Sequence, residues 1–362
     1  MQRFKPAKAV LATLATASLV AVAACGGPGA PGNESVNTEG DVPSQSSEEL
    51  EAAALEEGKL VWYTSNTRPA ADAIARMFEE KYEGITVEVF QAGGSQVIAK
   101  VEAEAMAGRI NADFVDYSEG AAAVGQSERG LFQRYLPPNI SSISEDLYDE
   151  DGFFYSPYYL TSTIVYNSDI VSDEDAPTSW ADLTDPAWQG KVGMASPDYA
   201  GTAVATVGTW QQEFGDEYIE DLGSNGLTVF EGFGNVHEAV LSGQAPVGVN
   251  LSFRALKAEQ EGQHMKWITP EEGQLLLSFA SAVTTDAQHP NAAKLFSNFL
   301  LTDELQELVA TEIGYFPGMK EIAAEAGMPD TTDMELISAD INELADPAFI
   351  ASVKSKFRAA TS

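Results

Sequence analysis

Little in this sequence supplies the groups that thiol chemistry or nucleic-acid binding requires. It has one cysteine in 362 residues, which excludes a disulfide framework, a thiolate zinc cluster and a Cys-x-x-Cys redox site. Basic residues are also scarce, since 20 Lys and Arg stand against 55 Asp and Glu, for a formal net charge of −35. This charge repels phosphate backbones and anionic headgroups, so we expect no nucleic-acid partner.

The sequence also lacks the common catalytic motifs. It has no Gly-x-Ser-x-Gly elbow and no Gly-x-x-x-x-Gly-Lys phosphate loop. His237-Glu238 lacks the second histidine of a His-Glu-x-x-His zinc site, and the other two histidines lie far away in the chain. Asp113 and Asp116 end a strand, where two carboxylates can hold an amine or a metal or do acid/base work. Because no nucleophile accompanies them, we expect no catalytic residue, no metal and no cofactor.

The first 25 residues have the layout of a secretory signal. Basic residues precede an uncharged apolar run from residue 9 to residue 24, and Cys25 follows. The run ends in Val22-Ala-Ala-Cys25, which resembles the lipobox of bacterial lipoproteins. We therefore expect lipidation of Cys25, by fatty acids such as palmitate. The alternative is an ordinary signal peptide or N-terminal anchor whose cysteine is incidental.

Composition and length predict how the rest of the chain is divided. With 44% hydrophobic residues it can bury a large core, and about 100–200 residues per domain predicts two lobes. Residues 26 to about 47 are rich in Gly, Pro, Asn, Ser and Glu and read as a tether. The predicted parts are a signal peptide at 1–25, a flexible tether and short helix at 26–57, a first lobe at 58–160 plus 278–318, a second lobe at 161–277, and a C-terminal helical segment at 319–362 that packs on the lobes.

Alternating strand and helix patterns predict an α/β fold in both lobes. In the first lobe, strands over Lys59–Thr64, Ile85–Phe90 and Asp113–Tyr117 alternate with helices, as in a parallel sheet. The second lobe has strand and helix patterns at Lys191–Ala195, Gly201–Phe214, Val236–Leu241, Pro246–Asn250 and Phe253–Gly262. The apolar stretch Leu275–Thr284 is expected to return the chain to the first lobe, where Pro290 begins a helix.

These segments, in this order, resemble a known family. The matching pieces are Val61-Trp-Tyr-Thr-Ser65, Phe90-Gln-Ala-Gly-Gly-Ser95, Ala112-Asp-Phe-Val-Asp116, Ile164-Val-Tyr-Asn167, Pro177-Thr-Ser-Trp-Ala-Asp-Leu183, Trp188-Gln-Gly-Lys-Val192, Pro246–Asn250 and Asn291–Leu300. They are similar to the extracellular solute-binding proteins of ABC importers, in the branch of ferric-ion, hexose-phosphate, phosphonate, thiamine and polyamine binders. The resemblance covers about residues 59 to 317. It implies a two-lobe periplasmic-binding-protein-like fold (type II) with a ligand cleft between the lobes.

Turns that follow strands supply the expected contacts for the ligand. In such sheets ligands lie beyond the carboxyl ends of strands, where helix N-termini offer free N–H groups. Three turns qualify by sequence, and the resemblance places all three at the cleft; their residues are Thr64 and Ser65, Gly94 and Ser95, and Gly201 and Thr202. Ordinary helix capping is the alternative for each turn.

A buried anion in so acidic a protein needs a local positive charge. Arg254 is the first candidate, because its planar guanidinium suits phosphate or carboxylate and the resemblance places it at the cleft edge. A surface ion pair with Glu259 or Glu261 is the alternative, and Arg68 is a weaker choice. The other predicted contacts are Thr161 and Ser162 at the crossing between lobes, Tyr199 as a wall, and Asn250 at the end of its strand.

The predicted function is that of a lipid-tethered receptor on the outer face of the membrane. It would capture a small polar solute, most simply an organophosphate or phosphonate-like anion, by lobe closure and deliver it to an ABC permease and its ATPase as a monomer. Ferric iron is the runner-up. Iron binders of the family use two adjacent tyrosines where this chain has Ser252 and Phe253, so an iron site would need a rearrangement using Tyr63, Tyr117 or Tyr199. An exported hydrolase on the same scaffold, or an adhesive lipoprotein with a vestigial cleft, are the remaining alternatives.

Overall fold

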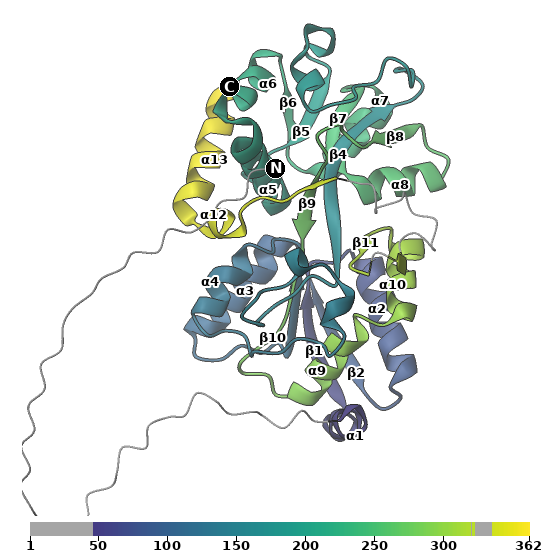
Figure 1. Ribbon diagram of the computed structural model, residues 1–362, viewed down its shortest axis with the longest axis vertical. Helices are drawn as coiled ribbons and strands as arrows, with labels where there is room; N and C mark the ends of the chain where they lie inside the picture. Colours follow the sequence, from purple (N-terminus) through teal and green to yellow (C-terminus); the bar gives the residue numbers. More distant parts are fainter. Residues whose placement is uncertain (1–45, 320, 323–334) are drawn as a thin grey trace, which may run out of the picture. The chain divides into compact units, whose positions relative to one another are not determined.

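A computed structural model of the protein describes residues 46–319, 321–322 and 335–362 (Figure 1). The predicted signal peptide at 1–25, with Cys25, and nearly all of the predicted tether lie outside the described residues. Part of the predicted C-terminal segment also lies outside them. No helix in the described ranges combines the length and the apolar character that crossing a membrane requires.

The first sheet has four strands in the order β10-β3-β1-β2. Strands β1 and β2 are parallel, β1 and β3 are parallel, and β10 joins β3 in the antiparallel direction. The bounds are β1 Lys59–Thr64, β2 Thr86–Gln91, β3 Phe114–Tyr117 and β10 Ala280–Val283. The predicted parallel β-α-β-α start is therefore confirmed, and the returning strand is the antiparallel edge.

Helices flank the first sheet because their apolar residues recur at helical spacing. Their bounds are α1 Ser47–Glu57, α2 Arg68–Lys81, α3 Gly94–Met106, α4 Ala122–Glu128, α9 Pro290–Phe299 and α10 Asp303–Leu308, followed by a π-helical turn at Val309–Ile313. One core cluster centres on Phe296, whose ring centroid lies 5.0 Å from those of Trp62 and Phe78. On α3, Val97 and Val101 are fully buried and belong to a second cluster with Val115.

The second sheet is mixed and has eight strands. Its main order is β12-β9-β4-β7-β5-β6, and β8 and β11 pair with β4. Strands β5, β6 and β7 are parallel, whereas β4 runs antiparallel to β7, β8, β9 and β11. The bounds are β4 Tyr158–Asn167, β5 Val192–Ala195, β6 Thr228–Phe230, β7 Val247–Leu251, β8 Met265–Ile268, β9 Gln274–Ser278, β11 Phe316–Pro317 and β12 Leu336–Ile337.

The helices around the second sheet bury aromatic residues. They are α5 Gly201–Phe214, α6 Asp216–Ser224, α7 Phe233–Ser242 and α8 Ser252–Gln260. Short 3-10 turns occur at Ile140–Ser142, Glu145–Leu147, Ala181–Thr184 and Pro186–Trp188. Trp180 and Trp210 are both fully buried, and their ring centroids lie 5.5 Å apart. Below, "first lobe" and "second lobe" mean the parts built on the first and second sheets.

Two stretches of chain connect the sheets. The apolar stretch from residue 275 onward forms β9 in the second sheet, turns at Phe279, and continues as β10 in the first sheet. Beside it runs β4, whose ten residues are all buried and which pairs with β9 from Tyr159↔Ser278 to Ser162↔Leu275. The predicted return of the chain to the first lobe is confirmed. Phe279 therefore lies between the end of β9 in the second sheet and the start of β10 in the first sheet.

The last described segment lies against the second lobe. Helix α13, Pro347–Ala360, packs on α5 and α6, and the short helix α12, Ile341–Ala345, contacts α4 of the first lobe (Figure 1). Val353 and Phe357 of α13 are buried, and Gly208 of α5 lacks the Cβ that would stand 2.7 Å from Leu344. This segment therefore reaches both lobes.

Candidate functional site

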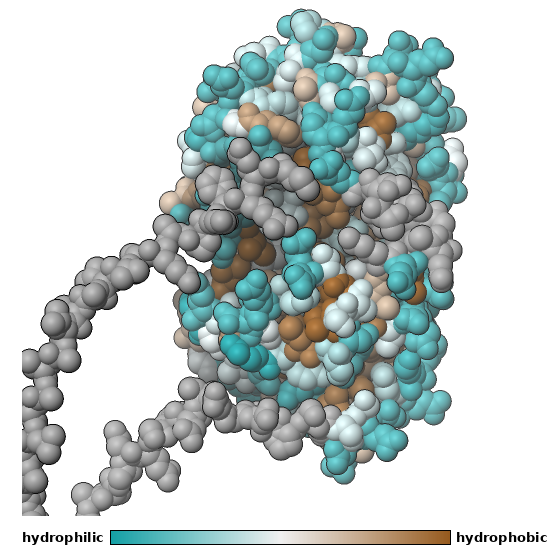
Figure 2. All heavy atoms as spheres, in the orientation of Figure 1, coloured by the Kyte–Doolittle hydropathy of each residue, from teal (hydrophilic) through white to brown (hydrophobic). Residues whose placement is uncertain are grey.

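The described residues form a cavity of about 840 Å³ where the two lobes and the C-terminal segment meet. Its walls come from the starts of α3 and α5, the loop after β3, the 145–156 loop, the turn around Phe279, and α12 with the start of α13. Figure 2 shows apolar side chains gathered at mid-height on this face, with hydrophilic ones above and below. The cavity wall combines apolar side chains with acidic ones, and Lys354 is its basic residue.

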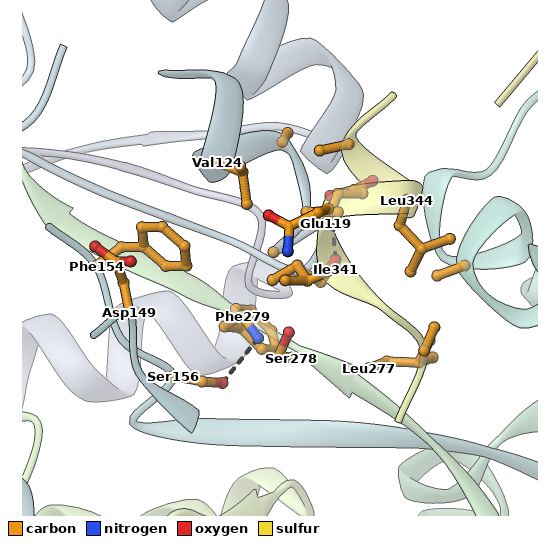
Figure 3. Close-up of a pocket in the computed structure, with 18 of the residues that line it drawn as sticks. Glu119, Val124, Asp149, Phe154, Ser156, Leu277, Ser278, Phe279, Ile341 and Leu344 are labelled. Atoms are coloured by element: carbon orange, nitrogen blue, oxygen red, sulfur yellow. Dashed lines mark hydrogen bonds between the residues drawn. The ribbon is translucent and has the colours of Figure 1, made fainter. Parts of the chain in front are cut away.

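Glu119 projects into this cavity from the loop after β3 (Figure 3). Its side chain lies against the first residue of α3 and the first residue of α5. A Cβ on Gly94 would stand 1.5 Å from Glu119 Oε2, and a Cβ on Gly201 would stand 2.5 Å from its Cγ. The Gly94 and Gly201 turns predicted to receive an anion are thus brought together, and a carboxylate of the protein lies between them.

Burial raises the pKa of Glu119 to about 7, although hydrogen bonds from the Ser118 hydroxyl, its own amide and the Ser95 amide lower it. The neighbouring Gly120 donates its N–H to the Ser278 carbonyl at 3.2 Å. Ser65 Oγ accepts a 2.9 Å hydrogen bond from the Ser118 amide. Through these hydrogen bonds, the loop that contains Glu119 is attached to the end of β1 and to the turn at Phe279.

A second buried carboxylate, Asp116, lies below this loop in β3. Its Oδ2 accepts hydrogen bonds from Asn66 Nδ2 at 2.8 Å and from the Tyr158 hydroxyl, and its Oδ1 accepts one from Ser281 at 3.3 Å. Burial raises the pKa of Asp116 to about 7, and these three donors lower it. Because Tyr158 begins β4, this network joins the first sheet to the strand that enters the second.

Asp113 and Asp116, which the sequence offers as a pair, have separate structural roles. Asp113 Oδ1 accepts the amides of Gln288 and His289 at 2.7 and 3.0 Å, and its Oδ2 accepts the Val61 amide at 2.8 Å. Its Oδ2 also lies 2.8 Å from His289 Nδ1. Both carboxyl groups are fully buried, and each is held by donors of the protein.

Arg254 lies in the first turn of α8, after the end of β7. Its guanidinium stands 5.2 Å over the Phe253 ring, and its buried Nε has no hydrogen-bond partner. Burial lowers the pKa of Arg254. The ion pair with Glu259 or Glu261 does not form among the described residues, whereas Arg68 is exposed and pairs with Asp72 at 2.9 Å.

Aromatic rings connect the surroundings of Arg254 to the cavity. Tyr315, which interacts electrostatically with Arg254, has its ring centroid 5.1 Å from that of Phe253 and 5.8 Å from that of Phe279. Phe279 in turn lines the cavity that contains Glu119. Arg254 itself is not among the residues that line this cavity, and it is connected to it only through the rings of Phe253, Tyr315 and Phe279.

Several predicted contact residues have partners within the protein. Thr64 Oγ1 accepts from the Asn66 amide and side chain at 3.0 Å, and Asn250 Nδ2 donates to the Phe233 carbonyl at 3.2 Å. Thr161 donates to Ser252 Oγ at 2.8 Å. Ser162 differs, because its buried hydroxyl has no partner among the described residues. The ligand roles of these four residues stay predictions.

Tyr199 and Thr202 lie near the start of α5. Tyr199 is 72% exposed and lines a shallow hollow with Ser196, Val229, Phe230 and Glu231. Thr202 is buried, and its carbonyl accepts a 2.9 Å hydrogen bond from Thr206. The two residues therefore do not face the Glu119 cavity, whose α5 wall consists of Gly201, Val204 and Ala205.

The described residues show no group of three His, Cys, Asp or Glu side chains placed to hold a metal ion. Two of the three tyrosines proposed for a rearranged iron site, Tyr63 and Tyr117, are engaged in hydrogen bonds, whereas Tyr199 is exposed. Tyr63 donates to Glu104 at 3.1 Å and Tyr117 to Gln126 at 2.5 Å. Burial raises the pKa of both phenols, which opposes the phenolate form that ferric iron needs.

Residues 111–346 match the sequence model of the family described as bacterial extracellular solute-binding protein. The chain belongs to this family. A 270-residue stretch is 26% identical to an uncharacterized protein of Haemophilus influenzae and covers 72% of this chain and 77% of that protein. A similar stretch is 23% identical to a probable ABC transporter periplasmic-binding protein of Sinorhizobium fredii, covering 72% and 75%. The protein is thus a solute-binding component of an ABC transporter.

Solved solute-binding proteins share the fold. One is the substrate-binding protein of an Agrobacterium tumefaciens ABC transporter, with a TM-score of 0.74 at 19% identity, covering 84% of this chain and 94% of that one. AfuA of Actinobacillus pleuropneumoniae, with fructose-6-phosphate bound, gives 0.69 at 22%, covering 84% and 98%. Iron-bound HitA of Pseudomonas aeruginosa gives 0.68 at 21%, covering 84% and 99%. These similarities confirm the predicted type II fold of the solute-binding protein.

Sequence reasoning missed Glu119 and the cavity walls formed by the 145–156 loop and the C-terminal segment. A signal for Glu119 was present, because Ser118-Glu119-Gly120 directly follows a strand, as the predicted contact Ser65 does. The walls carried no such signal, since they approach the cavity only through tertiary packing.

Proposed function

We propose that this solute-binding protein captures a small organic anion, such as an organophosphate or a phosphonate, and delivers it to an ABC permease. The observation that carries the proposal is Arg254, a cation with a buried, unpartnered Nε in a protein of net charge −35. Carboxylates outnumber bases by more than two to one, yet none of the described ones pairs with it. A guanidinium of this kind favours a bidentate anionic partner from outside.

The position of Arg254 in its helix and the ligands of related structures also support an anionic ligand. Arg254 is at the third position of α8, in the first turn of the helix, and the amides of a helix's first turn favour anions. AfuA, whose structure has the same fold, has the phosphate ester fructose-6-phosphate bound. HitA, which also has this fold, has iron bound, but the paired tyrosines of the family's iron binders are replaced here by Ser252 and Phe253.

Isothermal titration calorimetry of the purified protein with a panel of ligands tests this proposal. The panel contains methylphosphonate, glucose-6-phosphate, ferric citrate, thiamine and spermidine. We expect binding to one of the two phosphorus-containing anions at micromolar affinity or better, the scale of about −8 kcal/mol. Binding of ferric iron or spermidine, with neither anion bound, would refute the choice of ligand.

We also propose that acylated Cys25 tethers the protein to the outer face of the membrane, as its resemblance to a lipobox suggests. Family membership supports an extracellular or periplasmic location, and the lipid anchor would keep the receptor close to its permease. Mass spectrometry of the N-terminal peptide from membrane fractions tests this. We expect a diacylated peptide that starts at Cys25, and a Cys25→Ala variant should be released from the membrane fraction.

A further inference from the structure

We propose that Glu119 acts as an internal substitute for the anionic ligand: its carboxylate joins the N-terminus of α3 to that of α5 and holds the ligand-free lobes together. An anion that binds at the predicted Gly94 and Gly201 turns then competes with Glu119 for the same amides. This competition rests on the proposed function and on the predicted ligand role of these turns, whereas the bridging follows from how Glu119 packs against the two glycines.

The first step is the contact with both helices. Gly94 is the first residue of α3 in the first lobe, and Gly201 is the first residue of α5 in the second lobe. Both lie so close to Glu119 that a Cβ on either would overlap its side chain, at 1.5 Å and 2.5 Å. The carboxylate is therefore seated between two helix N-termini on different sheets. Their partial positive charges favour a negative group at that place.

The second step is how the carboxylate is held. The Ser95 amide, in the first turn of α3, donates to it, and so does the Ser118 hydroxyl at 3.4 Å. Neither Gly93 nor Ala200, the N-cap residues of α3 and α5, makes a side-chain cap bond. Glu119 thus supplies the negative group that a capping side chain or a bound anion would supply elsewhere.

The third step concerns the charged groups that face Glu119 from the elements around it. From the cavity walls, α3, α4, α5, α12 and the turn at Phe279 contribute no titratable side chain. Tyr117 of β3 interacts with Glu119 electrostatically, and Lys354 of α13 lines the same cavity. The remaining titratable groups are those of the facing loop, Glu145, Asp146, Tyr148, Asp149, Glu150 and Asp151. Glu119 is the one among these carboxylates that contacts both helix N-termini.

Two consequences follow for the transport protein. When Glu119 is ionised, its carboxylate accepts a hydrogen bond from the amide at the start of α3. An anionic solute must displace this carboxylate and therefore binds more weakly. When Glu119 is protonated, near or below pH 7, the competition weakens and anion binding strengthens. Glu119 would therefore set how strongly the receptor retains an anion at a given pH.

Small-angle scattering of the ligand-free protein tests the bridge without any ligand. The variants are Glu119→Ala, Glu119→Gln and Gly94→Ala, the last of which places a Cβ 1.5 Å from Oε2 and must expel the carboxylate. The control is Glu145→Gln, which removes an acidic group from the same cavity but not from between the helices. We expect a larger radius of gyration for Glu119→Ala and Gly94→Ala than for the parent and the control. An unchanged radius of gyration in both variants would overturn the bridge.

Calorimetry with methylphosphonate tests the competition. We expect Glu119→Gln to bind the probe about tenfold more tightly than the parent at pH 8, a difference of about 1.4 kcal/mol. The two proteins should converge at pH 6, and because the probe itself titrates in this range, they are compared at each pH. Equal affinity at pH 8 would overturn the competition and leave the proposed function standing. If neither protein binds any anion, the proposed function fails, and the scattering result still decides the bridge.

Discussion

At the scale of single residues, a basic side chain without an acidic partner stands out in so acidic a protein. Most described lysines and arginines pair with a nearby carboxylate at the surface, as Lys266 does with Asp173 and Lys356 with Asp216. Exposed pairs of this kind contribute little to stability, typically 0–1 kcal/mol. Arg254 lacks such a pair, and its buried Nε has no hydrogen-bond partner among the described residues, which is the basis for our proposal that it binds the ligand.

Replacing Arg254 should therefore affect binding much more than stability. We expect Arg254→Ala to weaken binding of the anion that the calorimetric panel identifies by about 10- to 100-fold, since hydrogen bonds to charged groups contribute about 1.5–3 kcal/mol. The melting temperature should change by only a few degrees. Arg68→Ala is the matched control, because Arg68 is exposed and paired with Asp72. Equal affinity in Arg254→Ala and the parent would remove this residue from the site.

Asp116 should make the fold less stable as the pH rises. Burial raises its pKa from 3.8 to about 7, so the folded state holds a proton that the unfolded state has lost between these values. Folding stability is then highest at low pH and falls as the pH rises toward and through 7. We expect the free energy of unfolding in urea to fall between pH 5 and pH 8 by about 1–3 kcal/mol more in the parent than in Asp116→Asn.

The control for this measurement is Asp151→Asn, which changes a carboxylate whose side chain is 77% exposed. It should keep the pH dependence of the parent. Glu119 contributes a slope of the same sign, so some dependence remains in Asp116→Asn. The same slope in Asp116→Asn and the parent would contradict the assignment of the raised pKa.

At the scale of helices and strands, local patterns predicted most of the fold. Lys59–Thr64 is a strand, Gly201–Phe214 is a helix and Pro290 begins α9, each at the predicted place. Apolar spacing and turn residues determine such elements locally. The antiparallel direction of β4 against β7, β8 and β9 was not predictable, because strand direction depends on how distant segments pair.

In the candidate site, too, the local elements could be predicted from the sequence, whereas the contacts between distant residues could not. Helix starts at Gly94 and Gly201 were found, because a strand followed by Gly and a small polar residue is a local signal. That Glu119 joins them was not, since its contacts come from two helices more than 20 and 80 residues away. The partners of Thr64 and Asn250 were also hidden, because a buried hydroxyl or amide looks the same in sequence whether a ligand or the protein satisfies it.

Helix α13 gives a test at this scale. Phe357 is 1% exposed and belongs to the main core cluster, so truncating it leaves a cavity. We expect Phe357→Ala to lower the free energy of unfolding by about 3 kcal/mol. Arg358→Ala, which removes an exposed ion pair with Asp198 at 3.1 Å, should cost less than about 1 kcal/mol. A loss below about 1 kcal/mol for Phe357→Ala would show that α13 is not part of the core.

At the scale of the whole molecule, the two sheets, the crossing strands and the C-terminal segment together enclose the cavity that contains Glu119. The crossing near Phe279 and the length of β4 fix which loops face each other, and α12 and α13 add a wall that touches both lobes. The strong negative charge surrounds an interior that holds Arg254. An anionic solute, the class that we propose, would therefore be opposed at long range and favoured at short range, and lobe closure would supply the close contact that it needs.

Native mass spectrometry of the protein after incubation with a small-molecule extract of cells tests the central claim most directly. The account predicts an adduct that is released on denaturation, contains phosphorus, and is lost in Arg254→Ala but retained in Arg68→Ala. An adduct of ferric iron or of an organic amine, equally abundant in Arg254→Ala, would contradict it.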